Sequence, residues 1–208
     1  MITEKEKNEN KETFLDLVRS INRPNMNKEL LIKQLIESDF FDAPASTQYN
    51  NSFDGGLCKH CLQVYTNLSV LCKLFYPNPI SEDSIKIVSL FHDFSKMNYY
   101  VGEIKNKKVY SDKGSKSDSM GKYDWVSVPG YTVKPANQRF GVGTPAENSA
   151  YMVNTFIPLT FEEYSAILNV NGGMTKDDSP IDMWKKHPLS LLLHQADCLA
   201  AFIQENNE

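Results

Sequence analysis

The stretch that decides the fold is "SLFHDFSKMNYY", residues 89–100. It places His92 and Asp93 side by side in a segment that is otherwise apolar and helical in pattern, with Lys96 one turn later. An unpaired carboxylate among apolar residues is costly, so we expect Asp93 to face a metal ion, a cation or several hydrogen-bond donors. Imidazole and carboxylate are also common ligands of divalent metals in hydrolases. The pair therefore predicts a metal site, provided that the rest of the chain supplies partners.

Two other apolar helical segments carry polar residues of the same kind. His60 lies in "GGLCKHCLQVY" and Asp197 in "LSLLLHQADCLAAFI". Each has an ordinary explanation when taken alone, since His60 can be a core histidine and Asp197 can belong to a buried salt bridge with Lys96 or an arginine. His194 precedes Asp197 by three residues on the same helical face, where it can contact substrate, support the site or simply pack, and packing is favoured. Together with the His92–Asp93 pair, His60 and Asp197 predict a metal centre.

Composition and charge exclude several classes of protein. The chain has 208 residues, 41% hydrophobic and 23% charged, with a net charge of -4, which is typical of one soluble globular domain. The negative charge argues against binding to a nucleic-acid polymer, and we expect Lys105, Lys107 and Lys108 in a hairpin turn. No apolar run is long enough to cross a membrane, and the charged start is not a signal peptide, so the cytoplasm is the expected location.

The four cysteines are predicted to be packing residues. Cys58 and Cys61 form a C-x-x-C motif, but Cys72 and Cys198 do not supply a second pair of zinc ligands at comparable spacing. A thioredoxin-like role would need a strand before the motif, whereas the apolar pattern predicts a helix through it.

The spacing of apolar residues predicts a mainly α-helical chain. Residues 1–10 are polar and are expected to fray. Beyond them apolar residues recur at helical spacing, and capping signals mark several helix starts. Helices are expected in "KETFLDLVRSI" and "NKELLIKQLIESDFF", over residues 57–75, after the caps Ser81, Thr144 and Thr160, and from His187 or Pro188 to Ile203.

Between about residues 99 and 133 the period changes to two. The segments "YYVGEIKNKKVYS" and "YDWVSVPGYTV" alternate and are rich in Val, Tyr and Trp, which predicts a β-hairpin insert. The segment "DKGSKSDSMGK" between them is expected to be its mobile tip, and "NGGMTKDDSP" is a predicted loop. The predicted fold is a single, mainly α domain over residues 1–208 with a small β insert.

At this point the residues resemble the HD superfamily of metal-dependent phosphohydrolases, whose pattern is H…HD…D. The segments "SDFFDAPASTQYNNSFDGGLCKHCLQVYTNL", "LFHDFSKMNYY", "WVSVPGYTV" and "LLLHQADCLAAF" resemble those of small HD-domain proteins of bacteria and their phages, in the same order. The resemblance implies a helical HD bundle. It also implies metal ligation by His60, His92, Asp93 and Asp197, with Lys96 holding a substrate phosphate.

The sequence departs from this group at two positions. Its members often carry two further histidines that allow a second metal, in "GHGEKS"-like and "WHMGG"-like segments. Aligned on the shared E-x-S and GG, this chain has Pro145 and Val170 there, and neither side chain can bind a metal. We therefore expect one divalent metal (Mn, Co, Mg, Fe or Zn) or none.

Two functions follow from the resemblance. In the first, a single metal activates water against a nucleotide or nucleotide-like phosphate, with Asp93 and Lys96 as the catalytic residues. In the second, a catalytically reduced HD-fold protein binds and sequesters a nucleotide signal, as a phage protein acting against host defence would. The candidate substrate-binding residues are Lys96, His194, Glu147, Arg139 and Tyr131. The expected partner is a nucleotide-like small molecule, and aromatic segments leave a homo-oligomer open.

Overall fold

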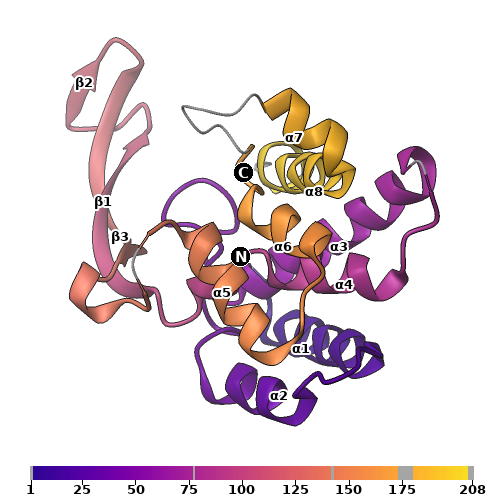
Figure 1. Ribbon diagram of the computed structural model, residues 1–208. Helices are drawn as coiled ribbons and strands as arrows, with labels where there is room; N and C mark the ends of the chain where they lie inside the picture. Colours follow the sequence, from indigo (N-terminus) through magenta and orange to yellow (C-terminus); the bar gives the residue numbers. More distant parts are fainter. Residues whose placement is uncertain (1, 77, 142, 173–179, 206–208) are drawn as a thin grey trace.

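The chain folds into a mainly α-helical body from which a narrow antiparallel sheet projects (Figure 1). The computed structural model describes residues 2–76, 78–141, 143–172 and 180–205. The α-helices are α1 (Glu4–Ser20), α2 (Lys28–Glu37), α3 (Gly56–Phe75), α4 (Glu82–Phe91), α5 (Pro145–Phe156), α6 (Phe161–Leu168), α7 (Pro180–Lys186) and α8 (Pro188–Leu199). The strands are β1 (Tyr100–Tyr110), β2 (Lys116–Asp118) and β3 (Gly121–Val133), and the 3₁₀ turns are η1 (Phe94–Lys96) and η2 (Ala136–Gln138).

The predicted hairpin is confirmed, but it carries a third strand. β1 pairs with β3 along its whole length, from Tyr100 opposite Val133 to the far end of the ribbon. The expected tip contains β2, which pairs with the other edge of β3 in the order β1-β3-β2. Asp118 holds this strand because its carboxylate accepts hydrogen bonds from Lys108 Nζ at 2.7 Å and Tyr110 Oη at 3.0 Å.

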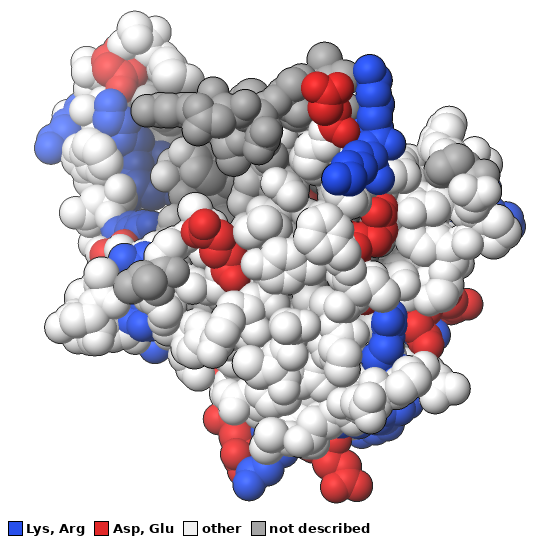
Figure 2. Space-filling view, in the orientation of Figure 1, with Lys and Arg blue, Asp and Glu red and all other residues white. Residues whose placement is uncertain are grey.

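The placement of three lysines in the hairpin turn was wrong. Lys105, Lys107 and Lys108 all lie within β1. Figure 2 shows lysine and arginine side chains gathered along the projecting sheet, whereas the helical face beside it is mostly uncharged. Among the residues that the structure describes, no helix is both long and apolar enough to cross a membrane.

The expectation that residues 1–10 fray was also wrong, because α1 begins at Glu4. Thr3 and Glu6 form a capping box, in which each side chain bonds to the backbone N–H of the other residue. Lys7 then forms ion pairs with Asp42 and Asp54. These local and long-range contacts outweigh the polar composition of the segment.

A cluster of buried phenylalanines lies within the core. Phe14 of α1 packs against Phe40 with a centroid distance of 5.0 Å, and against Phe91, at the end of α4, at 5.9 Å. Phe94 packs on Phe91 at 5.4 Å, directly after the His92–Asp93 pair. The core is therefore continuous with the backbone that carries the predicted metal ligands.

Helix α3 lies at the centre of the body, in contact with α1, α4 and α8. Its start depends on Gly56, because an added Cβ would lie 2.0 Å from the carbonyl oxygen of Asn51. This close approach brings the preceding loop, which includes Asn50, against the first turns of α3. Cys58 and Cys61 on this helix are buried and free, and burial raises the pKa of the Cys58 thiol to about 12, as expected for packing residues.

The other capping signals are confirmed, whereas the last helix differs from expectation at its end. Ser81, Thr144 and Thr160 each accept a hydrogen bond at the start of α4, α5 and α6. α8 begins at Pro188 but ends at Leu199, and the chain continues as a π-helical turn, Ala200–Gln204. Residues 173–179 of the predicted "NGGMTKDDSP" loop lie outside the described residues.

Candidate metal centre

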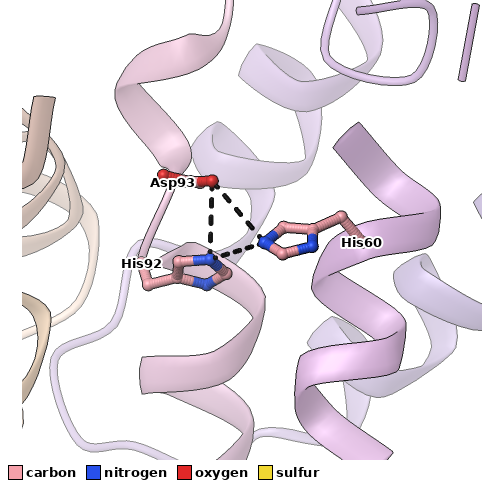
Figure 3. A group of neighbouring side chains, drawn as sticks. All are labelled: His60, His92 and Asp93. Carbon is pink, nitrogen blue, oxygen red and sulfur yellow. Dashed lines mark hydrogen bonds and ion pairs between the residues drawn. The ribbon is translucent and has the colours of Figure 1, made fainter. Parts of the chain in front are cut away.

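His60 and the His92–Asp93 pair converge where α3 packs against α4 (Figure 3). His60 projects from α3, whereas His92 and Asp93 lie between the end of α4 and η1. The Nε2 atoms of His60 and His92 are 3.3 Å apart. Asp93 Oδ2 lies 3.8 Å from His60 Nε2 and 3.5 Å from His92 Nε2. All three residues are buried, and together they can hold a metal ion.

The fourth predicted ligand, Asp197, reaches the same group from α8. Its Oδ1 lies 3.1 Å from His60 Nε2 and 3.9 Å from His92 Nε2. Ligand atoms lie about 2.0–2.2 Å from a bound metal, so neighbouring donors around one ion are roughly 3 to 3.5 Å apart. The donors of His60, His92 and Asp93 lie close enough together to hold one ion, and Asp197, with Oδ1 3.1 Å from His60 Nε2, lies next to this group.

The second nitrogen of each histidine contacts a hydrogen-bond acceptor. His92 Nδ1 lies 2.8 Å from the carbonyl oxygen of Ser89, and His60 Nδ1 lies 3.0 Å from Glu205 Oε2. Because a carbonyl oxygen and a carboxylate only accept, we assign the hydrogen of each neutral ring to Nδ1. The two Nε2 lone pairs then face each other and the two aspartates, so the centre requires a cation or a proton.

The electrostatics of the centre are those of a cation site. Burial lowers the pKa of His60, but the carboxylates of Asp197 and Glu205 outweigh it and raise that pKa to about 10. Burial raises the pKa of Asp93, but the positive charge of Lys96 outweighs it and, together with the hydrogen bond to the neighbouring His92 ring, brings that pKa well below its usual range. The pKa of Asp197 is also lowered, because its hydrogen bond with His60 outweighs burial. In the metal-free protein a proton on His60 therefore occupies the place of the metal.

Lys96 lies beside Asp93 rather than Asp197. Its Nζ is 2.6 Å from Asp93 Oδ2 and donates to the carbonyl oxygen of Ala45 at 2.8 Å. Burial opposes the charge of Lys96, but Asp93 outweighs it and raises the lysine pKa above its ordinary value. The lysine is therefore fixed, with its charge intact, at the edge of the predicted metal centre.

The centre contains one carboxylate that sequence reasoning missed. Glu205, just after the π-helical turn, contacts His60 and accepts a hydrogen bond from Asn50 Nδ2 at 3.0 Å. Its side chain is only 3% exposed. Its position near the end of the chain, beyond the apolar part of the last helix, gave no signal of burial.

Two of the candidate substrate-binding residues have structural contacts instead. His194 Nδ1 lies 2.7 Å from the carbonyl oxygen of Val170, and its ring stacks on Trp184, which agrees with the favoured packing role. Glu147 is exposed and closes the capping box of α5, where its carboxylate accepts from the backbone N–H of Thr144 at 2.6 Å. Neither contact involves the metal centre.

Arg139 and Tyr131 lie near the base of the sheet. Arg139 donates to Tyr99 Oη at 3.0 Å and lines a cavity of about 230 Å³ next to the start of α5. Tyr131 is half-buried and borders an open cavity of about 620 Å³ together with Phe53 and Ile104. Both residues remain candidates for ligand contact.

Pro145 and Val170, the two residues aligned with the extra histidines, both have structural contacts. Pro145 is the first residue of α5, and its carbonyl oxygen accepts a hydrogen bond from Ser95 Oγ at 2.7 Å. Val170 is buried in the core. The remaining histidine, His187, lies 2.9 Å from Glu162, so within the described ranges only His60 and His92 contribute imidazoles to the centre.

No family model matches the chain, and neither a curated protein nor a solved structure is significantly similar to it. The assignment of a function therefore depends on the geometry of the metal centre. It also depends on the order in which the chain supplies the ligands: a histidine from α3, a histidine–aspartate pair after α4, and an aspartate from α8.

The pKa of His60 predicts how metal binding depends on pH. A folded-state pKa of about 10, above the ordinary value of 6.5, stabilises the metal-free protein below pH 6.5, and this contribution is lost as pH rises toward 10. A metal must displace the same proton, so its affinity increases over that range. We expect the rise in melting temperature caused by Mn²⁺ to grow between pH 6.5 and 8.5, as measured by thermal unfolding with Mn²⁺ or with a chelator. A shift that stays constant with pH would contradict a centre that exchanges a proton for the metal.

Proposed function

We propose that the protein is an HD-type phosphohydrolase that uses a single divalent metal to hydrolyse a phosphate bond of a nucleotide or nucleotide-like molecule. The observation that supports this proposal most directly is the buried group of His60, His92 and Asp93, with Asp197 Oδ1 beside it at 3.1 Å from His60 Nε2. The order H…HD…D is supplied by a histidine on α3, the adjacent pair after α4 and an aspartate on α8.

The residues of the centre would have separate roles in such a reaction. A bound divalent metal polarises a phosphoryl oxygen and lowers the pKa of its water, which supplies a nucleophile near neutral pH. Lys96 contributes a positive charge beside Asp93, and its ammonium group has three N–H donors. Two of them bond to Asp93 and to the carbonyl oxygen of Ala45, which leaves one for a phosphate oxygen.

A second candidate function is sequestration of a nucleotide signal without hydrolysis. Pro145 and Val170 favour it, because the loss of two histidines reduces the metal-binding capacity of the site. His187 and His194 do not replace them, since their ring nitrogens contact Glu162 and the Val170 carbonyl oxygen. The complete set of four ligands favours the hydrolase.

A panel of nucleotides tests the proposal. Linear nucleotides, cyclic nucleotides and ADP-ribose derivatives would be incubated with the protein and Mn²⁺, Co²⁺ or Mg²⁺, then analysed by chromatography before and after heat denaturation. We expect a new product that requires the metal and disappears in Asp93→Ala. Asp112→Ala, which removes an exposed aspartate in the sheet insert, is the matched control and should retain activity.

The other outcomes of this experiment are equally informative. A nucleotide that disappears from solution and returns unchanged after heating would overturn the hydrolase and support sequestration. If the protein is shown to hold the metal but no nucleotide of the panel is either converted or bound, both functions are contradicted.

A further inference from the structure

Both ring nitrogens of His60 face carboxylates from the C-terminal segment of the chain. Asp197 Oδ1 lies 3.1 Å from Nε2, and Glu205 Oε2 lies 3.0 Å from Nδ1. We propose that Glu205 is a positioning residue of the metal centre, which fixes the ring orientation and the protonated nitrogen of His60 so that Nε2 is presented to the metal. This inference rests on the proposed metal centre.

The contacts of Glu205 are those of a built site rather than of a surface residue. Both of its carboxylate oxygens lie within 3.1 Å of His60 Nδ1, and Oε2 also accepts from Asn50 Nδ2 at 3.0 Å. The side chains of Glu205 and His60 are 3% and 2% exposed. A buried carboxylate is costly unless it is paired and hydrogen-bonded, and these two partners meet that requirement.

The π-helical turn brings Glu205 to this position. In an uninterrupted α-helix, residue 205 would be rotated by about 80° from Asp197, because each residue advances the helix by about 100°. The wider π turn reduces that rotation, and the Glu205 N–H bonds to the carbonyl oxygen of Ala200, five residues back, at 3.0 Å. Asp197 and Glu205 can therefore reach the same histidine from one end of one helix.

A second pair of hydrogen bonds anchors the turn on α3. Asn67 Nδ2 donates to Gln204 Oε1 at 2.8 Å, and Gln204 Nε2 donates to Asn67 Oδ1 at 3.1 Å. Asn67 Nδ2 also lies 3.1 Å from the carbonyl oxygen of Ala196 on α8. The helix that carries His60 thus holds the segment that carries Glu205, which preorganises the contact between the two residues.

The chemical consequence is specific to a metal ligand. With its hydrogen kept on Nδ1 by Glu205, the ring offers the Nε2 lone pair, and the nearby negative charge increases its basicity. In carboxylate–histidine–metal arrangements of this kind, removal of the outer carboxylate commonly weakens metal binding by roughly 10- to 100-fold.

The substitution Glu205→Gln tests this role. It keeps the size of the side chain and removes its charge, so we expect the Mn²⁺ dissociation constant of metal-free protein to rise by roughly 10- to 100-fold. Free Mn²⁺ would be counted by electron paramagnetic resonance during titration, a readout independent of activity. The matched control is Glu162→Gln, which alters another glutamate–histidine contact, 2.9 Å from His187, and should leave Mn²⁺ affinity unchanged.

The outcomes separate this inference from the proposed function. If the wild-type protein does not bind Mn²⁺ or any other divalent metal tried, the metal centre itself fails. If the wild type binds and Glu205→Gln binds equally well, Glu205 is not a positioning residue, even where the variant is less stable. If Glu205→Gln does not fold, Glu205→Asp is the alternative variant, because it keeps the charge but is one methylene shorter. A Mn²⁺ affinity of Glu205→Asp equal to that of the wild type would overturn the inference.

Discussion

The substitution Asp93→Asn is expected to abolish metal binding and to lower the stability of the metal-free protein by about 3–5 kcal/mol, because it removes one partner of a buried ion pair. Asp93 Oδ2 lies 2.6 Å from Lys96 Nζ, and the side chains of the two residues are 13% and 20% exposed. Without the carboxylate, the lysine keeps its charge in a largely buried place. Chemical denaturation in the presence of a chelator gives the stability, and Mn²⁺ titration gives the affinity.

A second variant separates the two consequences of this substitution. Asp93→Asn combined with Lys96→Met removes both charges, so the double variant should regain much of the lost stability and still fail to bind metal. If Asp93→Asn alone kept near-wild-type stability, the ion pair would not hold the backbone of the centre. If it kept near-wild-type Mn²⁺ affinity, Asp93 would not be a ligand.

The four proposed ligands could be found from the sequence because each is a polar residue in a segment whose pattern is apolar and helical, although the structure ends α4 at Phe91, just before His92 and Asp93. His60, His92, Asp93 and Asp197 stand out against their neighbours, and burial of such groups demands partners. The structure groups His60, His92 and Asp93, and places Asp197 Oδ1 3.1 Å from His60 Nε2. Helix starts such as those after Thr144 and Thr160 were also predictable, since a capping box is complete within four residues.

Features that depend on distant contacts were not predictable in this way. Glu205 meets Asn50 across 155 residues of sequence, and only a π turn directs it there. Lys7 stabilises the polar start of α1 through Asp42 and Asp54, which no local pattern reveals. In each case a long-range contact overrides the preference that the local composition expresses.

The candidate metal centre lies where three helices of the body meet. His60 lies on the central helix α3, His92 and Asp93 follow the end of α4, and Asp197 lies on α8; α3 makes extensive contacts with both α4 and α8. The histidine contacts with Ser89 and Glu205 then fix the rings within this frame. Packing of the helices therefore determines the distances between the donor atoms.

The substitution Phe94→Ala tests this dependence of the site on the core, and we expect it to cost about 3–5 kcal/mol of stability because it empties a packed aromatic position. Phe94 is fully buried, and its ring lies 6.1 Å from that of Phe40 and 5.4 Å from that of Phe91. It directly follows Asp93, so its loss should also weaken Mn²⁺ binding, although less than Asp93→Asn does. Urea denaturation with a chelator and Mn²⁺ titration measure the two effects.

The matched control is Phe75→Ala at the end of α3, where the phenylalanine is 67% exposed. Its removal should change stability by no more than about 0.5 kcal/mol and leave Mn²⁺ affinity unchanged. A loss of stability in Phe94→Ala no greater than in this control would show that the aromatic cluster does not hold η1. If Phe94→Ala is clearly destabilised but binds Mn²⁺ as tightly as the wild type, the proposed ligands keep their positions without the Phe94 ring. The cavity left by the ring would then affect only the core and not the metal centre.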